Sequence, residues 1–228
     1  MTIDDVYKLM LYIVAKNKQQ GYLSPADFNI VINQAQKSYV DYLLGSFQQY
    51  RYDKPEARVE FGQNEIIRQR LTPFINTYNI VVDSNGNAPY PQYFIQVDSM
   101  KSAMTFAYSP VARIRAVQEN YLDSYHNSVI DPIASNPIYL LQKNQFQFYP
   151  VTIATAKLSY IKEPNTMVWG YTLDGNSRPV YDASTSVSPQ WYDVDLFQII
   201  VRALELVGVS MQSADVFKFS QSVKAGGQ

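Results

Sequence analysis

The sequence has 228 residues, enough for one large domain or two small ones, with 19 Lys and Arg, 20 Asp and Glu, one His and no Cys. The absence of Cys excludes a disulfide scaffold, thiolate metal sites and a cysteine nucleophile, and one His excludes a two-histidine metal site. A formal charge of −1 excludes the strongly basic surface of a dedicated DNA- or RNA-binding protein.

The first predicted element is a helix over residues 3–14, where apolar side chains recur every three or four residues. Asp4 and Asp5 lie in its first turn, where carboxylates favour the positive end of the helix dipole. Gly21 is the expected stop, because glycine readily adopts the backbone conformation that ends helices.

A second, longer helix is predicted to begin at Pro25. Ser24 is a typical cap, proline suits the first helical position, and Asp27 is the acid expected two residues later. No proline follows before Pro55, so this helix can run for about 20 residues or more. A third helix is expected over residues 64–71.

The pattern changes to β from residue 76. Residues 78–83 predict a strand, Asn85-Gly86 a hairpin turn, and residues 93–97 the return strand. Residues 111–117 alternate apolar with small or basic side chains, as in a half-exposed strand.

An irregular polar stretch over residues 118–137 separates these strands from the next group. Three more strands are expected over residues 138–141, 146–148 and 156–161. Asp174-Gly175 predicts a further hairpin turn.

The last predicted helix opens between Pro189 and Asp195 and ends at Gly208, and an extended tail follows over residues 217–228. This order predicts an α+β protein: an N-terminal helical hairpin or bundle, a central antiparallel β module, and a C-terminal helix that returns to the helical part. The corresponding regions are residues 1–75, 76–190, 191–216 and 217–228.

The single histidine, His126, has acidic and serine neighbours in the sequence that a catalytic triad would need. Asp123 or Asp131 would orient it, and Ser124 or Ser128 would be the nucleophile. The sequence has no Gly-x-Ser-x-Gly turn to present such a serine. We therefore expect His126 to be a surface or interface residue and the protein not to be an enzyme.

Glycoside hydrolysis is a second chemistry to weigh, because it uses two carboxylates and aromatic sugar platforms. The close carboxylate pairs are Glu119 with Asp123 and Asp193 with Asp195, and the candidate platforms are Trp169 and Trp191. The Asp193–Asp195 pair is better explained by a helix start, and the tryptophans by core or interface packing. No phosphate-binding glycine loop or complete calcium loop is present, so no cofactor or metal is expected.

Uncharged polar residues replace much of the usual charge. Charged residues make up 17% of the chain, beside 14 Asn, 19 Gln and 19 Tyr. Interface cores favour aromatic residues over Lys and Glu, so one interpretation is a surface largely covered by neighbouring subunits. The other is compositional drift in an AT-rich genome. No segment approaches the ~20 apolar residues of a membrane span, and the first residues lack a signal-peptide pattern, so we expect no membrane partner.

Three stretches of the chain form a recognisable combination. The first is the opening pair of helices, with residues 24–28 (Ser-Pro-Ala-Asp-Phe) leading the second helix. The others are residues 136–150 with 158–164, and residues 190–197 (Gln-Trp-Tyr-Asp-Val-Asp-Leu-Phe) leading into the helix over 199–207. In these stretches the chain resembles the head-to-tail connector (adaptor or ring) proteins of short-tailed bacteriophages, especially crAss-like phages.

The resemblance implies a virion structural subunit, made in the host cytoplasm and assembled at the head–tail junction. Such proteins form a closed ring, expected here to be about twelve-fold, by head-to-tail contacts between copies. The implied partners are the portal protein and the next tail or ring protein, and DNA passes through the channel without specific binding. The residues expected at subunit contacts are Tyr39, Tyr42, Trp191, and Phe217 and Phe219 of the tail.

Two other functions stay open at this point. One is a glycan-binding or glycoside-cleaving module of a phage tail tip, dependent on Trp169 or Trp191 and on Glu119. The other is a free-standing ligand-binding α+β domain of a host, which would be a monomer at all concentrations.

Overall fold

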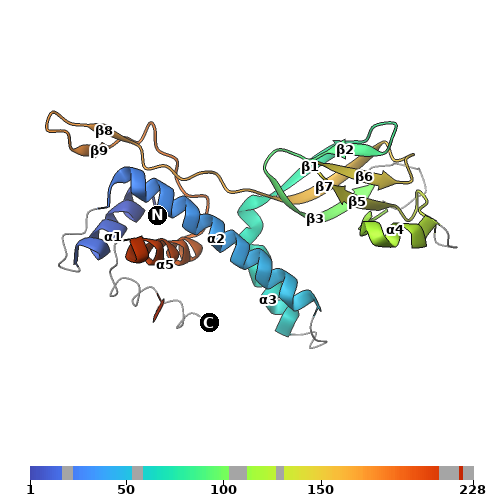
Figure 1. Ribbon diagram of the computed structural model, residues 1–228, viewed down its shortest axis with the longest axis horizontal. Coiled ribbons are helices and arrows are strands. Elements are labelled where there is room, and N and C mark those ends of the chain that lie inside the picture. The colour runs from blue at the N-terminus through green and yellow to red at the C-terminus, as the bar shows by residue number, and fades with distance from the viewer. Residues whose placement is uncertain (17–22, 53–58, 103–111, 127–130, 211–220, 223–228) are drawn as a thin grey trace. The chain divides into compact units, whose positions relative to one another are not determined.

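The computed structural model describes residues 1–16, 23–52, 59–102, 112–126, 131–210 and 221–222 (Figure 1). Its helices and its antiparallel and mixed sheets confirm the α+β class. The chain divides into two compact units: Met1–Pro73 with Pro164–Gln228, here called the helical unit, and Phe74–Glu163, here called the β unit. The chain therefore leaves the helical unit once, builds the β unit and returns.

The helical unit is built around a long helix, α2, which packs against α3 and α5, while α1 also packs against α5. The apolar faces of α1, α2 and α5 supply most of its buried side chains. Its described elements are α1 (Ile3–Lys16), α2 (Pro25–Tyr52), α3 (Val59–Leu71), β8 (Tyr171–Leu173), β9 (Pro179–Tyr181) and α5 (Asp193–Ser210).

The two N-terminal helices begin at reciprocal side-chain caps. Ahead of α1, Thr2 Oγ1 accepts a hydrogen bond from the Asp5 amide at 3.2 Å, and Asp5 Oδ2 accepts one from the Thr2 amide at 2.9 Å. Ahead of α2, Ser24 Oγ accepts from the Asp27 amide at 3.1 Å and donates to the Asp27 carboxylate at 2.6 Å. These contacts satisfy first-turn amides, and the predicted start of each helix is confirmed. The stop predicted at Gly21 lies outside the described residues.

The C-terminal helix runs past its predicted stop at Gly208 and ends at Ser210. Glycine inside a helix costs only about 1 kcal/mol relative to alanine. Leu204 and Val207 in the same turns are fully buried, and each such side chain contributes roughly 1.5–3 kcal/mol. Packing therefore outweighs the local stop signal, and this prediction is wrong. The tail predicted over residues 217–228 lies outside the described residues except for 221–222.

Amide side chains of α2 hold an extended segment of the chain against the helix. Asn33 Nδ2 donates to the Met167 carbonyl at 2.7 Å, and Asn33 Oδ1 accepts from the Met167 amide at 2.8 Å. Asn29, one turn earlier, makes the same two contacts with Trp169, at 3.3 and 2.8 Å. The side chains thus act as a neighbouring strand would for Met167 and Trp169, while Val168 between them forms a β-bridge with Val187.

This attachment corrects the predicted β-rich region of residues 76–190. Residues 164–190, including the predicted hairpin at Asp174-Gly175, belong to the helical unit. The β unit ends at Glu163. Hairpin chemistry shows where a chain turns, whereas contacts with distant residues, such as the amides of α2, decide which unit the segment joins.

The β unit contains two sheets. A three-stranded antiparallel sheet has the order β1-β7-β3, and a four-stranded sheet has the order β2-β6-β5-β4. The bounds are β1 (Ile75–Val81), β2 (Asn87–Pro89), β3 (Phe94–Ser102), β4 (Arg115–Ala116), β5 (Ile138–Gln142), β6 (Gln145–Tyr149) and β7 (Thr155–Lys162), with η1 (Thr72–Phe74) before β1 and α4 (Glu119–His126) after β4.

The turn at Asn85-Gly86 forms as predicted, but the hairpin predicted around it does not. Gly86 has φ 82°, and Asp83 Oδ1 accepts hydrogen bonds from the Asn85 and Asn87 amides at 2.9 and 2.7 Å. After the turn the chain enters β2, in the other sheet, and β7 lies between β1 and β3. A tight turn determines where the chain reverses, while the partner of each strand is decided by distant residues.

Two further predictions for this unit are corrected. The strand predicted over residues 111–117 is only the two-residue β4, and it pairs in parallel with β5, so the module is not purely antiparallel. The stretch predicted to be irregular over 118–137 contains α4. The three strands predicted over 138–141, 146–148 and 156–161 correspond to β5, β6 and β7.

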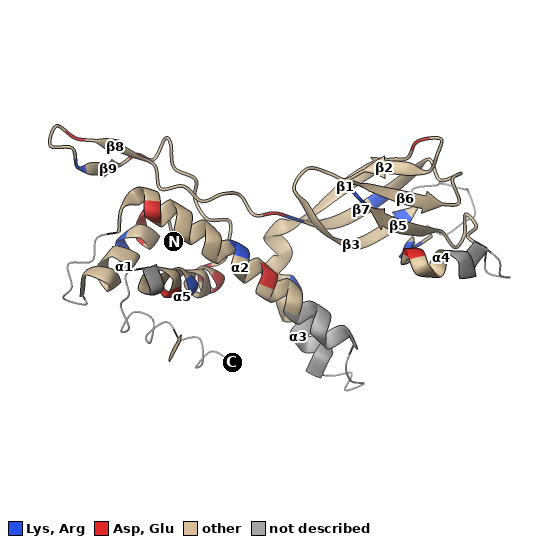
Figure 2. Ribbon diagram, viewed as in Figure 1, with Lys and Arg blue, Asp and Glu red and all other residues tan. Residues whose placement is uncertain are grey.

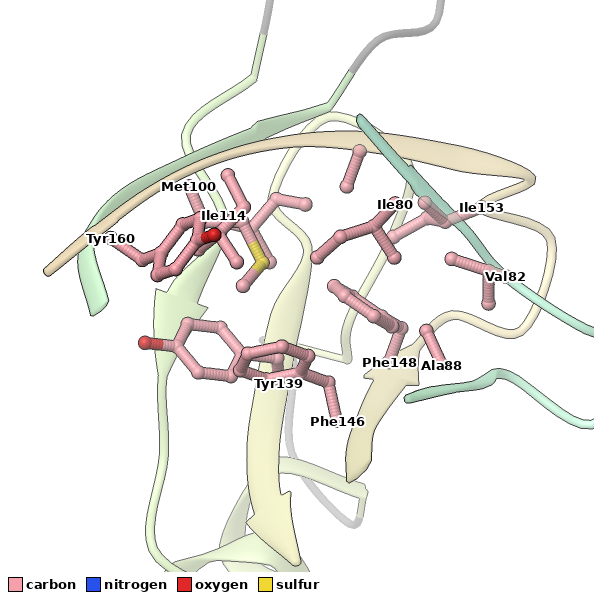
Figure 3. Packing of buried hydrophobic residues seen from close by; sticks show 12 residues of the cluster. Ile80, Val82, Ala88, Met100, Ile114, Tyr139, Phe146, Phe148, Ile153 and Tyr160 are labelled. Carbon is pink, nitrogen blue, oxygen red and sulfur yellow. The ribbon is translucent and has the colours of Figure 1, made fainter. Parts of the chain in front are cut away.

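The core of the β unit lies between the two sheets and is apolar and aromatic (Figure 3). Ile80, Met100 and Leu158 enter it from the three-stranded sheet, and Phe146 and Phe148 from the other. Burial alternates along β6 and β7, as expected for strands with one face on a core.

Candidate functional site

A group of aromatic and charged side chains in contact with one another lies in the helical unit. Here it is called the tyrosine–arginine cluster, and it draws on the middle of α2, the end of α3 and the start and middle of α5. Its members are Gln36, Tyr39, Tyr42, Arg70, Trp191, Asp195 and Arg202. Three of them, Tyr39, Tyr42 and Trp191, are residues that the sequence predicted at subunit contacts.

At its centre, Tyr39 donates a hydrogen bond to a buried carboxylate. The Tyr39 hydroxyl lies 2.7 Å from Asp195 Oδ1, and Asp195 is 1% exposed. Arg70 Nη1 donates to the Tyr39 hydroxyl at 3.3 Å, and Arg70 Nε lies 3.6 Å from Asp195 Oδ1. Asp195 also lies in the first turn of α5, whose amides carry partial positive charge. The carboxylate is therefore buried with compensating groups around it.

Burial is the main cause of a strong upward shift in the pKa of Tyr39, and the hydrogen bond to Asp195 adds to it. Arg202 lies over the same ring, with its guanidinium carbon 4.9 Å from the ring centroids of both Tyr39 and Tyr42. The two rings are nearly parallel, at 17°. Burial lowers the pKa of Arg202, and contact with two electron-rich ring faces offsets the lost hydration.

Trp191 completes the cluster just ahead of α5. Its Nε1 donates to Gln36 Oε1 at 3.0 Å, and its ring lies 5.2 Å from that of Tyr39. The Gln36 Nε2 group donates to the Asn165 carbonyl at 3.1 Å, so this amide continues the row formed by the asparagines of α2. The cluster thus joins α2, α5 and the segment before α5.

Burial changes the interpretation of the predicted contact residues. Tyr39 is 1% exposed and Trp191 is 6% exposed, and both are covered by their own chain. The expectation that they contact another subunit is therefore wrong, whereas Tyr42 is 49% exposed. Phe217 and Phe219 lie outside the described residues.

The tryptophans are not sugar platforms, because neither has an open face. Trp169 is 4% exposed, its Nε1 donates to Asp4 Oδ1 at 3.1 Å, and its ring lies 4.2 Å from that of Tyr7. Tyr171 and Tyr181 are also in ring contact with it. The glycan-binding interpretation therefore loses both of its aromatic residues.

The predicted carboxylate pairs do not form a catalytic arrangement in the described residues. Asp195 is buried, whereas the side chain of Asp193 is 71% exposed and contacts the Met1 amino group at 2.6 Å. Glu119 is exposed at the start of α4 in the β unit, and the side chains of Asp123 and His126 in that helix lie outside the description.

Two apolar surfaces of the helical unit were not predicted from the sequence. Tyr192, just before α5, is 53% exposed, and Val194 and Phe197 in its first turns are 69% and 45% exposed. On the β8–β9 hairpin, Leu173 is 63% and Val180 49% exposed. Helical spacing could have identified Val194 and Phe197 as a face separate from the buried Leu196 and Ile200, but it could not show that this face is uncovered.

Within the residues the structure describes, no three His, Cys, Asp or Glu side chains are grouped to hold a metal ion. Over the same residues, no helix is both long and apolar enough to cross a membrane. No protein-family model matches the sequence, and no match is found among curated proteins.

Proposed function

We propose that this protein is a non-enzymatic structural subunit of a virion, forming a closed ring in the head-to-tail connector of a short-tailed bacteriophage. In this role the ring lies below the portal protein, extends the DNA channel and joins the next ring or tail protein. The resemblance of residues 24–28, 136–150 with 158–164, and 190–197 to connector proteins suggests the role. The surface of the helical unit supports it.

The observation that carries the proposal is the apolar surface at the start of α5. Val194 and Phe197 are three residues apart on a helix, so their side chains share one face. They are 69% and 45% exposed, although the opposite face of the helix is fully buried. Covering an apolar side chain contributes roughly 1.5–3 kcal/mol, so a neighbouring subunit can bind this face without charged contacts.

The low charge of the chain is also compatible with a DNA channel. Among the residues that Figure 2 colours, Lys, Arg, Asp and Glu are thinly spread in each unit, and the formal charge of the whole chain is −1. Lys and Arg that contact DNA phosphates bind the duplex tightly and release its counterions. A wall without such a surface allows DNA to pass during ejection.

The decisive experiment is light scattering combined with negative-stain imaging of the purified chain, with and without portal protein. Closed rings of about a dozen copies, formed alone or only on the portal, are the expected result. A monomer that persists at high concentration and does not bind the portal would reject the proposal.

Val194→Glu sharpens this experiment. Glutamate in the first turn of α5 favours the helix dipole, so the fold is expected to persist while subunit contact is lost. Ile30→Glu is the matched control, because Ile30 is equally exposed, at 69%, on the polar face of α2. Equal loss of rings in both variants would show that the α5 surface has no special part in assembly.

A further inference from the structure

The two edge strands of the three-stranded sheet differ in how well they are protected from pairing with a strand of another chain. Edge strand β3 has register shifts between Phe94 and Gln96 and between Val97 and Ser99, carries Asp98 and Lys101, and is bridged at Lys101 by Arg113. Bulges and charges of this kind keep sheet edges from pairing with other chains. β1, the opposite edge, is seven residues long, has continuous register with β7 and contains no charged residue.

The hydrogen-bond pattern between β1 and β7 shows which backbone amides and carbonyls of β1 point away from β7. The Val82 amide donates to the Ala154 carbonyl at 3.0 Å, in the same register as β1 and β7. In an antiparallel pair, every second residue points its backbone groups at the partner. The amides and carbonyls of Thr77, Asn79 and Val81 therefore point away from β7, and in the described part of the chain β1 pairs with β7 alone.

The β8–β9 hairpin is a second open edge, and it belongs to the helical unit, where it projects beyond the helices (Figure 1). The Asp182 amide donates to the Gly170 carbonyl and the Asp174 amide to the Arg178 carbonyl, both at 2.9 Å. By the same alternation, Tyr171 and Leu173 of β8 point their backbone groups outward, as does Pro179 of β9. Proline has no amide hydrogen, so β9 is a poor edge and β8 is the open one.

Both ends of this hairpin are held firmly, although its strands are almost uncovered. A Cβ on Gly170 would lie 2.2 Å from Thr185 Oγ1, and the Gly170 amide donates to Ser186 Oγ at 2.9 Å. At the tip, Asp174 Oδ1 accepts from the Asn176 and Arg178 amides, each at 2.8 Å. A two-stranded hairpin is marginal in water, so an ordered and exposed one is suited to pairing with a further strand.

We propose that β8 of one copy pairs with β1 of the next copy and so adds the hairpin to its three-stranded sheet. This inference rests on the proposed ring. A head-to-tail ring needs two different, complementary surfaces on one chain, and here an open strand of the helical unit meets an open strand of the β unit. Both strands lack charged residues, so backbone hydrogen bonds form without burying a charge.

Cysteine cross-linking tests the contact, because the chain has no Cys of its own. Leu173→Cys chains are mixed with size-tagged chains that carry Asn79→Cys, Thr77→Cys or Val81→Cys, under ring-forming conditions with portal protein, and oxidised. A disulfide between the two sizes is expected for at least one β1 position, since paired strands bring Cα atoms within disulfide range. Lys101→Cys is the matched control on the protected edge β3, and it should stay unlinked.

The outcomes separate this inference from the proposed function. Rings without any mixed disulfide would overturn the β8–β1 contact and leave the ring intact. A failure to form rings, with or without the portal, would reject the proposed function and this inference together. Disulfides only between two Asn79→Cys chains would overturn the β8–β1 contact and indicate two-fold pairing of β1 with β1. A chain that carries both Leu173→Cys and Asn79→Cys tests one more alternative, because a disulfide within that single chain would show that β8 and β1 pair inside one copy.

Discussion

Both units have apolar cores, but they differ in the buried polar contacts that they add to them. The β unit encloses a core of aromatic and aliphatic side chains between two sheets. Of the four polar or charged side chains that are buried in the described residues, Gln36, Asp195 and Arg202 belong to the helical unit. Apolar burial is non-directional, whereas hydrogen bonds require a defined geometry. The polar contacts of the helical unit therefore select which distant segment lies on α2.

The largest expected effect comes from removing apolar volume in the β unit. Phe148→Ala should lower the free energy of unfolding by about 3–5 kcal/mol, because Phe148 is fully buried and leaves a cavity. Urea unfolding followed by near-ultraviolet circular dichroism measures this. Val151→Ala is the control in the same unit, since Val151 is half exposed and should cost less than about 1 kcal/mol. Equal losses in both variants would contradict a core centred on the aromatic residues.

Features that depend on neighbouring residues could be predicted from the sequence, and features that depend on distant residues could not. The caps at Ser24 and Asp27, and the turns at Asn85-Gly86 and Asp174-Gly175, depend on neighbouring residues and were found by local pattern. The place of β7 between β1 and β3 was missed, because it depends on pairs of residues from 54 (Ser102 and Ala156) to 86 (Ile75 and Ile161) positions apart.

The candidate site was predicted less well than the fold. Tyr39, Tyr42 and Trp191 were identified from composition and resemblance, and the structure does bring them together. Aromatic residues suit interfaces and cores equally, so composition could not show that Tyr39 and Trp191 are covered by their own chain. The role of Asn29 and Asn33 was also missed, because an amide on a helix carries no signal for the backbone it will meet.

A smaller effect should follow from removing one of those amides in the helical unit. Asn33→Ala leaves the Met167 amide and carbonyl without their partner, and we expect a loss of about 1–2 kcal/mol. Faster hydrogen exchange at the Met167 amide is the local measurement. Gln34→Ala, an exposed neighbour, controls for helix propensity and should change neither quantity. Unchanged exchange at Met167 would show that packing, not the Asn33 amide, holds the segment on α2.

The smallest effect concerns a single hydroxyl and its pH dependence. Tyr39→Phe removes the hydrogen bond to the buried Asp195 carboxylate, which should cost roughly 1.5–3 kcal/mol at neutral pH because the acceptor is charged. The smaller quantity of interest is the part of this cost that changes with pH. Because folding raises the pKa of Tyr39 above its ordinary value of 10.0, the wild-type hydroxyl contributes fully below pH 10 and loses this contribution as pH rises toward the folded pKa. The stability difference between wild type and Tyr39→Phe should therefore shrink above pH 10 in urea unfolding.

Tyr90→Phe extends this measurement to the β unit. Burial raises the pKa of Tyr90 as well, but its hydroxyl donates to the Gln142 carbonyl, which carries no formal charge, at 2.6 Å. In the helical unit the acceptor is a carboxylate, which disfavours a second negative charge beside it. The alkaline change should thus be larger for Tyr39 than for Tyr90. Equal changes in the two variants would mean that burial alone raises the pKa of both tyrosines. The carboxylate of Asp195 would then make no difference between the helical unit and the β unit.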